Sequence, residues 1–187
     1  MKAHFYSRKG DDGTTGWLGQ GRIQKFDIRI ETIGSLDECS SFVGTARSVV
    51  KTPGAREALI QIQRDLYAIM TEISADAENA KRFLRIEQKD VEWLELQIAT
   101  FSEKMTMPSD FILPGDSFSG ALVDNARTSV RKAERRASEF FQTGQVKNGA
   151  ILSFLNRLSS FLFVLEICEN INSGVASTLL AASDKNL

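Results

Sequence analysis

Histidine, cysteine and proline are scarce in this chain of 187 residues. The only histidine, His4, argues against a histidine-rich metal site and against a Ser-His-Asp triad anchored in the body of the protein. The two cysteines, Cys39 and Cys168, lack the C-x-x-C spacing of redox and zinc motifs, so we interpret them as buried apolar groups in a reducing compartment. All three prolines lie where helical periodicity has lapsed, which is typical of long helices joined at prolines.

An excess of one charge is also missing, and so is a long hydrophobic run. The chain has 23 Lys and Arg residues against 24 Asp and Glu residues, whereas nucleic-acid binders are strongly basic. The longest apolar run, Phe161–Leu165, is too short to span a bilayer, and Met1–Gly21 is too polar for a signal peptide. We therefore expect a cytoplasmic protein of one globular domain, with neither nucleic acid nor a membrane as partner.

Apolar residues at helical spacing predict an all-α fold, a five-helix up-down bundle of the ferritin-like type. We expect the helices at roughly 28–50, 55–75, 87–101, 116–142 and 148–170, and the fourth has Asp116 or Ser117 as a candidate N-cap. The chain then divides into a flexible segment 1–27, a bundle 28–172 and a tail 173–187, whose last part from Gly174 we expect to be frayed.

Five of the thirteen glycines are gathered between Gly10 and Gly21. Glycines let backbone N–H groups converge on an anion, and this segment also holds groups that suit a phosphate: Arg8, Lys9, Thr14, Thr15 and then Lys25. The Walker pattern is absent, and composition alone is equally compatible with an unstructured N-terminus. The concentration of phosphate-compatible groups favours an anion-binding segment.

In the expected fourth helix, Arg127, Arg131 and Glu134 are spaced i, i+4 and i+7, so they share one face beside the apolar seam. One interpretation is a phosphate clamp, because arginine offers a planar fork of donors. The other is a solvated basic face, which explains Lys132, Arg135 and Arg136 well.

Three further residues are candidates for a site. Asp37 falls on the expected inward stripe of the first helix, with Ile33, Ser40 and Gly44, and should pair with Arg127 or Arg131. Phe111 stands between two prolines, either as a plug over the end of the bundle or as a lid over a flat apolar ligand. Asn156 interrupts the apolar fifth helix, where it either bonds within the bundle or faces the same site as the arginines.

Five segments, taken in order, resemble the ATP:cob(I)alamin adenosyltransferases of the propanediol-utilisation type. They are Tyr6–Thr15, Arg29–Glu38, Phe111–Gly115, Ala126–Arg136 and Leu155–Ser159. The resemblance implies transfer of the 5′-deoxyadenosyl group of ATP to the cobalt(I) of cobalamin, with triphosphate released and Mg²⁺ accompanying the nucleotide. It also implies a homotrimer with active sites between subunits, and a cobalamin reductase or an adenosylcobalamin-dependent enzyme as a further partner.

The resemblance assigns roles residue by residue. The ATP-binding head would comprise Ser7, Arg8, Lys9, Gly10, Asp11, Gly13, Thr14, Thr15 and Lys25. Arg131, Glu134 and Asn156 match residues at the nucleotide, and no protein metal site is implied. Asp37 and Arg127 match an intersubunit ion pair on the cobalamin side. Phe111 matches the aromatic that blocks the lower face of the corrin, which displaces the axial base and leaves a four-coordinate cobalt that is easier to reduce.

The sequence departs from the family pattern at several positions. Asp116 follows Pro114-Gly115 where the family has a second glycine, which places a negative charge beside Phe111. Ser40, Lys132 and the C-terminal tail also differ. These departures motivate the alternative of a non-catalytic sensor or carrier that binds ATP or cobalamin.

Overall fold

The structure, a computed structural model, has five long helices, as the periodicity predicts. It describes residues 6, 8–76, 78–83, 86–103, 105–108 and 110–182, so His4 and Ser7 lie outside the described residues. The helices are α1 Ile28–Arg47, α2 Ala55–Ser74, α3 Gln88–Ser102, α4 Phe118–Phe141 and α5 Gly149–Asn172, with a short 3-10 helix at Ala80–Arg82. The all-α prediction is confirmed. Within the described ranges the only sheet is a small antiparallel pair, β1 Thr14–Thr15 with β2 Ile23–Gln24.

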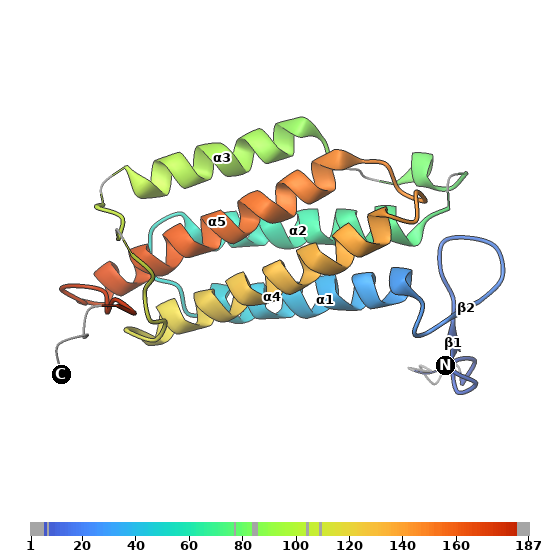
Figure 1. Ribbon diagram of the computed structural model, residues 1–187, viewed down its shortest axis with the longest axis horizontal. Coiled ribbons are helices and arrows are strands. Elements are labelled where there is room, and N and C mark those ends of the chain that lie inside the picture. Colours follow the sequence, from blue (N-terminus) through green and yellow to red (C-terminus); the bar gives the residue numbers. More distant parts are fainter. Residues whose placement is uncertain are drawn as a thin grey trace, which may run out of the picture.

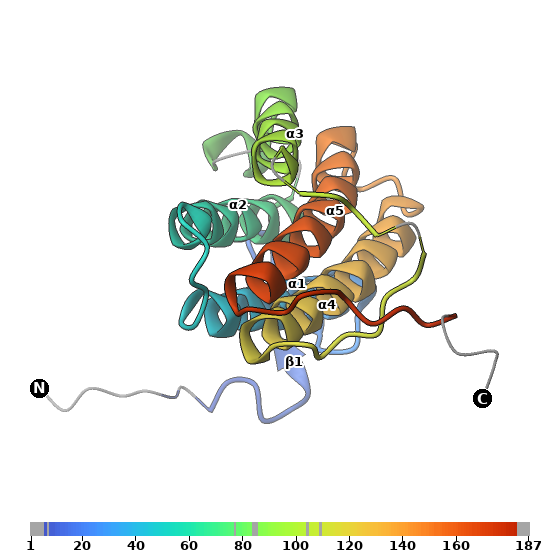
Figure 2. The ribbon, with the colours of Figure 1, turned by 90° about the vertical axis from the view of Figure 1, so that its left-hand side faces the viewer.

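Helix α4 lies between α1 and α5, while α2 packs on α1 and α3 packs on α5 (Figures 1 and 2). The core side chains include Leu36, Leu66, Val130, Phe154 and Phe161, all fully buried. By length and composition alone, the whole of helix α5 could cross a membrane, whereas the uninterrupted apolar run Phe161–Leu165 within it is too short to do so. About 67% of its most apolar window is buried in the bundle, as a core helix requires.

Side-chain caps fix where the helices begin. The Asp27 carboxylate accepts from Arg29 N at 2.8 Å, and the Ser117 hydroxyl accepts from Gly120 N at 3.0 Å. Ser117 is therefore the N-cap of α4, the second of the two candidates. Its hydroxyl also donates to Asn170 Oδ1 at 2.6 Å, which ties the start of α4 to the end of α5.

The inward face of α1 agrees in part with the expected one. Leu36 and Val43, both expected on the inward stripe, are fully buried together with Cys39, and Ile33, Ser40 and Gly44 are half-buried. Asp37 is exposed instead, because a carboxylate in the core would have to be desolvated. Placing Asp37 inside the bundle was therefore wrong.

The tail is not frayed up to residue 182. Leu180 forms an antiparallel bridge with Ile112, supported by bonds from Leu113 N to Leu179 O at 2.8 Å and from Ala181 N to Phe111 O at 2.7 Å. These bonds hold the tail along the connector that carries Phe111, at the end of the bundle where α4 begins (Figure 2).

Candidate functional site

The glycine-rich head folds into a hairpin with a tight loop before it. Gly13 N donates to Gly10 O at 3.3 Å, and Lys25 Nζ donates to Gly10 O at 2.7 Å. Arg8 and Gly13 both have positive φ, 58° and 83°. These two residues and the Lys25 bond close the loop into a compact turn that carries Arg8 and Lys9, two cationic side chains that suit an anion.

This loop is held by two polar side chains, those of Arg22 and Asp12, which the sequence did not single out as site residues. Arg22 donates to Thr14 Oγ1 at 2.6 Å, to Thr14 O at 3.0 Å and to Lys9 O at 2.5 Å. Asp12 Oδ1 accepts from Thr14 N at 2.9 Å and from Thr14 Oγ1 at 2.7 Å, and these bonds lower the pKa of the Asp12 carboxyl. The signal for Arg22 lay in its position directly before β2, the strand that pairs with Thr14 and Thr15, which only the folded hairpin reveals.

The head is tied to the bundle at Trp17 and Leu18. Leu18 N donates to Ser74 O and Asp76 N donates to Leu18 O, each at 3.0 Å, so Leu18 extends the end of α2 as a parallel bridge. Arg29 of α1 is 3% exposed and lies under the Trp17 ring. Burial lowers the pKa of Arg29, and Asp27 and Asp76 oppose that shift.

On the arginine face of α4, the interpretation as a solvated basic face accounts for Lys132 and Arg136. Lys132 pairs with Glu38 at 2.6 Å, and Arg136 pairs with Glu139 at 3.0 Å, both as solvated surface pairs. Arg131 is exposed, and its guanidinium has no hydrogen-bond or ion-pair partner within the described part of the chain. Its donors are therefore available to a ligand.

Glu134 and Asn156 lie together beside that face. Asn156 Nδ2 donates to Glu134 Oε1 at 3.1 Å, and Asn156 Oδ1 accepts from Arg157 at 2.9 Å. Arg157 in turn pairs with Glu95 of α3 at 2.8 Å. Asn156 is exposed, so its bonds lie at the surface of the bundle and link α5 to Glu134 of α4.

Phe111 and Arg127 meet at one cavity. The cavity has a volume of about 420 Å³ and is lined by Phe111, Arg127, Phe163 and residues of the proline-bounded connector. Phe111 is 89% exposed, so it does not plug the bundle, and the plug interpretation was wrong. Arg127 is half-buried and is bound by Asp124 of its own helix, with Oδ1 at 2.7 Å from Nε and 2.6 Å from Nη2.

One chain does not bring all the predicted site residues together. The head lies at the end of the bundle where α1 begins, and the Phe111 connector lies at the other end (Figure 1). No hydrogen bond or ion pair among the described residues joins the head to Arg131 or Glu134, or joins Asp37 to Arg127. Asp37 is exposed on α1, where a second chain can reach it.

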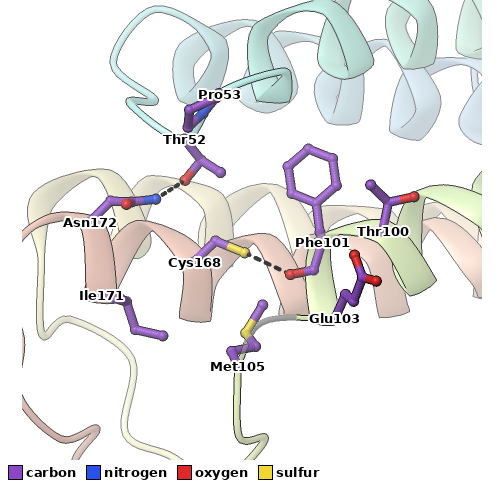
Figure 3. A pocket seen from close by; sticks show the side chains of 9 residues that line it. All are labelled: Thr52, Pro53, Thr100, Phe101, Glu103, Met105, Cys168, Ile171 and Asn172. Carbon is purple, nitrogen blue, oxygen red and sulfur yellow. Dashed lines mark hydrogen bonds between the residues drawn. The ribbon is translucent and has the colours of Figure 1, made fainter.

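Figure 3 shows a second cavity, of about 400 Å³. It is lined in part by Phe101, Met105 and Cys168, and contains none of the predicted site residues. The Cys168 thiol donates to Phe101 O at 3.5 Å. Burial raises the pKa of Cys168 to about 11 and that of Cys39 to about 12, so both free thiols stay neutral and are poor nucleophiles.

The chain is similar to proteins of one kind over nearly its whole length. A family model described as cobalamin adenosyltransferase matches residues 5–169. The chain is 32% identical over 175 residues to a corrinoid adenosyltransferase of Bacillus subtilis, covering 91% of this chain and 89% of that protein. It is 37% identical over 161 residues to a cobalamin adenosyltransferase of Cupriavidus metallidurans, covering 85% and 84%.

The fold of the chain is also similar to that of a solved structure. It is a phenylalanine-to-alanine variant of a PduO-type ATP:corrinoid adenosyltransferase from Lactobacillus reuteri, complexed with cobalamin and ATP. The TM-score is 0.83 at 27% sequence identity, and the match covers 96% of this chain and 99% of that one.

Proposed function

Because the chain belongs to the cobalamin adenosyltransferase family, we propose that the two ends of the bundle serve the two substrates of one adenosyl transfer. The protein is an ATP:corrinoid adenosyltransferase, which moves the 5′-deoxyadenosyl group of ATP to the cobalt of a reduced corrinoid.

The nucleotide site combines the head of one subunit with α4 of another. The loop of Arg8, Lys9, Gly10, Asp11 and Gly13 surrounds the phosphates, with Thr14, Thr15 and Lys25 behind it. Ser7 lies outside the described residues, and its assignment to the ATP-binding head rests on the resemblance alone. Arg131 approaches from the neighbouring subunit, with Glu134 and Asn156 beside it. Within the described part of one chain, no hydrogen bond or ion pair joins the head to Arg131 or Glu134, and this supports a homotrimer with active sites between subunits.

The reaction needs no protein nucleophile, because cobalt(I) attacks C5′ of ATP and triphosphate leaves. Negative charge accumulates on the triphosphate as the C5′–O bond breaks, so the cationic groups of the head and Arg131 stabilise the transition state. The nucleotide enters as its Mg²⁺ complex. Among the described residues no group of three or more His, Cys, Asp or Glu side chains could hold the ion, so the triphosphate supplies its main ligands.

The corrinoid binds at the cavity of Phe111 and Arg127. The exposed Phe111 ring covers the lower face of the corrin, displaces the axial base and leaves a four-coordinate cobalt. Losing an axial donor lowers the filled cobalt orbital, which makes reduction to cobalt(I) easier. Arg127 is completed by Asp37 of a neighbouring subunit, since both groups lie at the surface of their own chains.

The cellular setting follows from the chemistry. Two free cysteines are typical of a reducing compartment, so the protein works in the cytoplasm. A cobalamin reductase must supply the electron for cobalt(I), and an adenosylcobalamin-dependent enzyme consumes the product.

The observation that carries the proposal is Arg131, a surface guanidinium free of protein partners on the same helix face as Glu134. The test mixes the purified protein with MgATP and chemically reduced cobalamin and follows the absorbance change to adenosylcobalamin. Conversion above a protein-free control is expected. Saturable ATP binding without conversion would identify the sensor or carrier instead.

A further inference from the structure

A second carboxyl group is buried next to the one that holds Arg127. Glu166 of α5 is 1% exposed, and apart from its contact with the Asp124 carboxyl its oxygens have no hydrogen-bond partner in the described part of the chain. Asp124 of α4 is 7% exposed and lies close enough to interact with it. An unpaired carboxylate in a bundle core is strongly unfavourable, so Glu166 must be neutral or balanced by charge.

The surrounding charges determine which of the two acids keeps a proton. Burial first, and then the negative charge of Asp124, raise the pKa of Glu166 to about 8. Arg127 of α4 opposes this shift, and Asp116 before α4 adds a smaller contribution in the same direction as Asp124. At neutral pH Glu166 is therefore protonated, because a second negative charge buried beside the Asp124 carboxyl would be strongly unfavourable.

Asp124 connects this buried acid to the cavity of Phe111. Its Oδ1 receives both the Nε and Nη2 bonds of Arg127, and Arg127 lines the cavity assigned to the corrinoid. With Glu166 neutral, Arg127 has a single anionic partner on its own helix. With Glu166 ionised, a second negative charge on the α5 side pulls the guanidinium inward.

We propose that Glu166 is a positioning residue for Arg127: as a neutral acid it leaves Asp124 the sole internal counter-ion, which keeps the guanidinium at the corrinoid cavity. The inference rests on the proposed function, because that cavity is assigned to the corrinoid there. Glu166 touches neither substrate and acts only through Asp124 and Arg127.

The test compares wild type with Glu166→Gln between pH 7 and pH 9. A group with a pKa of about 8 loses about nine-tenths of its neutral form over this range. The KM for the reduced corrinoid, and the Kd for cob(II)alamin in the presence of MgATP, are therefore expected to rise by up to about tenfold in wild type. In Glu166→Gln, the KM for the reduced corrinoid and the Kd for cob(II)alamin should not change with pH. The KM for ATP should depend on pH in the same way in wild type and in the variant.

Asp65→Asn is the matched control. Asp65 is another buried acid with a raised pKa, about 6, but it lies on α2, which packs on α1. This variant should keep the wild-type pH dependence of corrinoid binding. Thermal unfolding checks the protonation of Glu166 without any substrate: the melting temperature of Glu166→Gln relative to wild type should increase up to about pH 8 and then level off.

The outcomes separate this inference from the proposed function. Equal pH dependence of cob(II)alamin binding in wild type and Glu166→Gln would overturn the positioning role even if both proteins turn over. A wild type that binds cob(II)alamin with the expected pH dependence but forms no adenosylcobalamin would uphold the role and reject the catalytic function. No cob(II)alamin binding at any pH would reject both.

Discussion

The indole ring of Trp17 lies over the guanidinium of Arg29, with 4.6 Å between the guanidinium carbon and the ring centroid. Arg29 also donates to Ala75 O at 3.0 Å, to Ile73 O, and to Gln145 Oε1 at 2.5 Å. One buried side chain of α1 thereby joins the root of the head, the end of α2 and the loop after α4.

This contact predicts how the head should respond to a mutation at its root. Trp17→Leu should weaken MgATP binding by about tenfold, since a desolvated cation–π contact contributes on the order of 1–2 kcal/mol. Stability should change little because Arg29 keeps its carbonyl partners. Calorimetry with MgATP measures the effect. Phe26→Ala, which removes a 78% exposed aromatic from the same segment, should leave the affinity unchanged.

Arg131→Ala should reduce kcat by about two orders of magnitude or more, the usual cost of removing a donor that stabilises transition-state charge. The helical circular dichroism should persist, because Arg131 makes no contact that holds the bundle. Arg135→Ala removes an exposed arginine one turn further along α4 and serves as the control. Equal activity of the two variants, or loss of the helical signal in Arg131→Ala, would contradict the assigned role.

Asp116 should matter through the tail rather than through its charge. Its Oδ2 accepts from Leu179 N at 3.0 Å, which holds the tail against the Phe111 connector. Asp116→Gly removes this acceptor, and the KM for the corrinoid should rise by about two- to fivefold, since one exposed hydrogen bond contributes about 0.5–1 kcal/mol. Hydrogen exchange at the Leu179 amide should become faster. Asp116→Asn keeps an oxygen acceptor, so a loss as large as that of Asp116→Gly would point to charge instead.

Asp65 makes the stability depend on pH in a known direction. Burial raises its pKa from 3.8 to about 6, so the unfolded chain loses this proton at lower pH than the native one does. Stability is therefore lost as pH rises from about 4 to about 6. Asp65→Asn removes this loss, and its free energy of unfolding at pH 7 should exceed that of wild type by up to about 3 kcal/mol. Denaturant titrations at pH 4 and pH 7 measure the change, and an equal difference at both values would refute it.

The helices were predictable because periodicity and caps are local signals. The exposure of Asp37 was not, because its spacing from Ile33 and Ser40 fits the inward stripe and only the packing of α2 and α4 on α1 decides where that stripe ends. The importance of Arg22 and Arg29 was also hidden, since their acceptors are mainly backbone carbonyls that leave no trace in residue type. Likewise, Glu166 marks only the end of an apolar run until α4 brings Asp124 beside it.

In the proposed site, the uninterrupted helix α4 carries residues for both substrates, and this would set the distance over which the two substrates meet. Arg127 and Glu134 are seven positions apart, which corresponds to about 10 Å along the helix axis. Inserting a single residue between them would lengthen this interval by only about 1.5 Å but would turn one group about 100° away from the other. The relative orientation of corrin ring and triphosphate is therefore far less tolerant of a change in the length of α4 than their separation is.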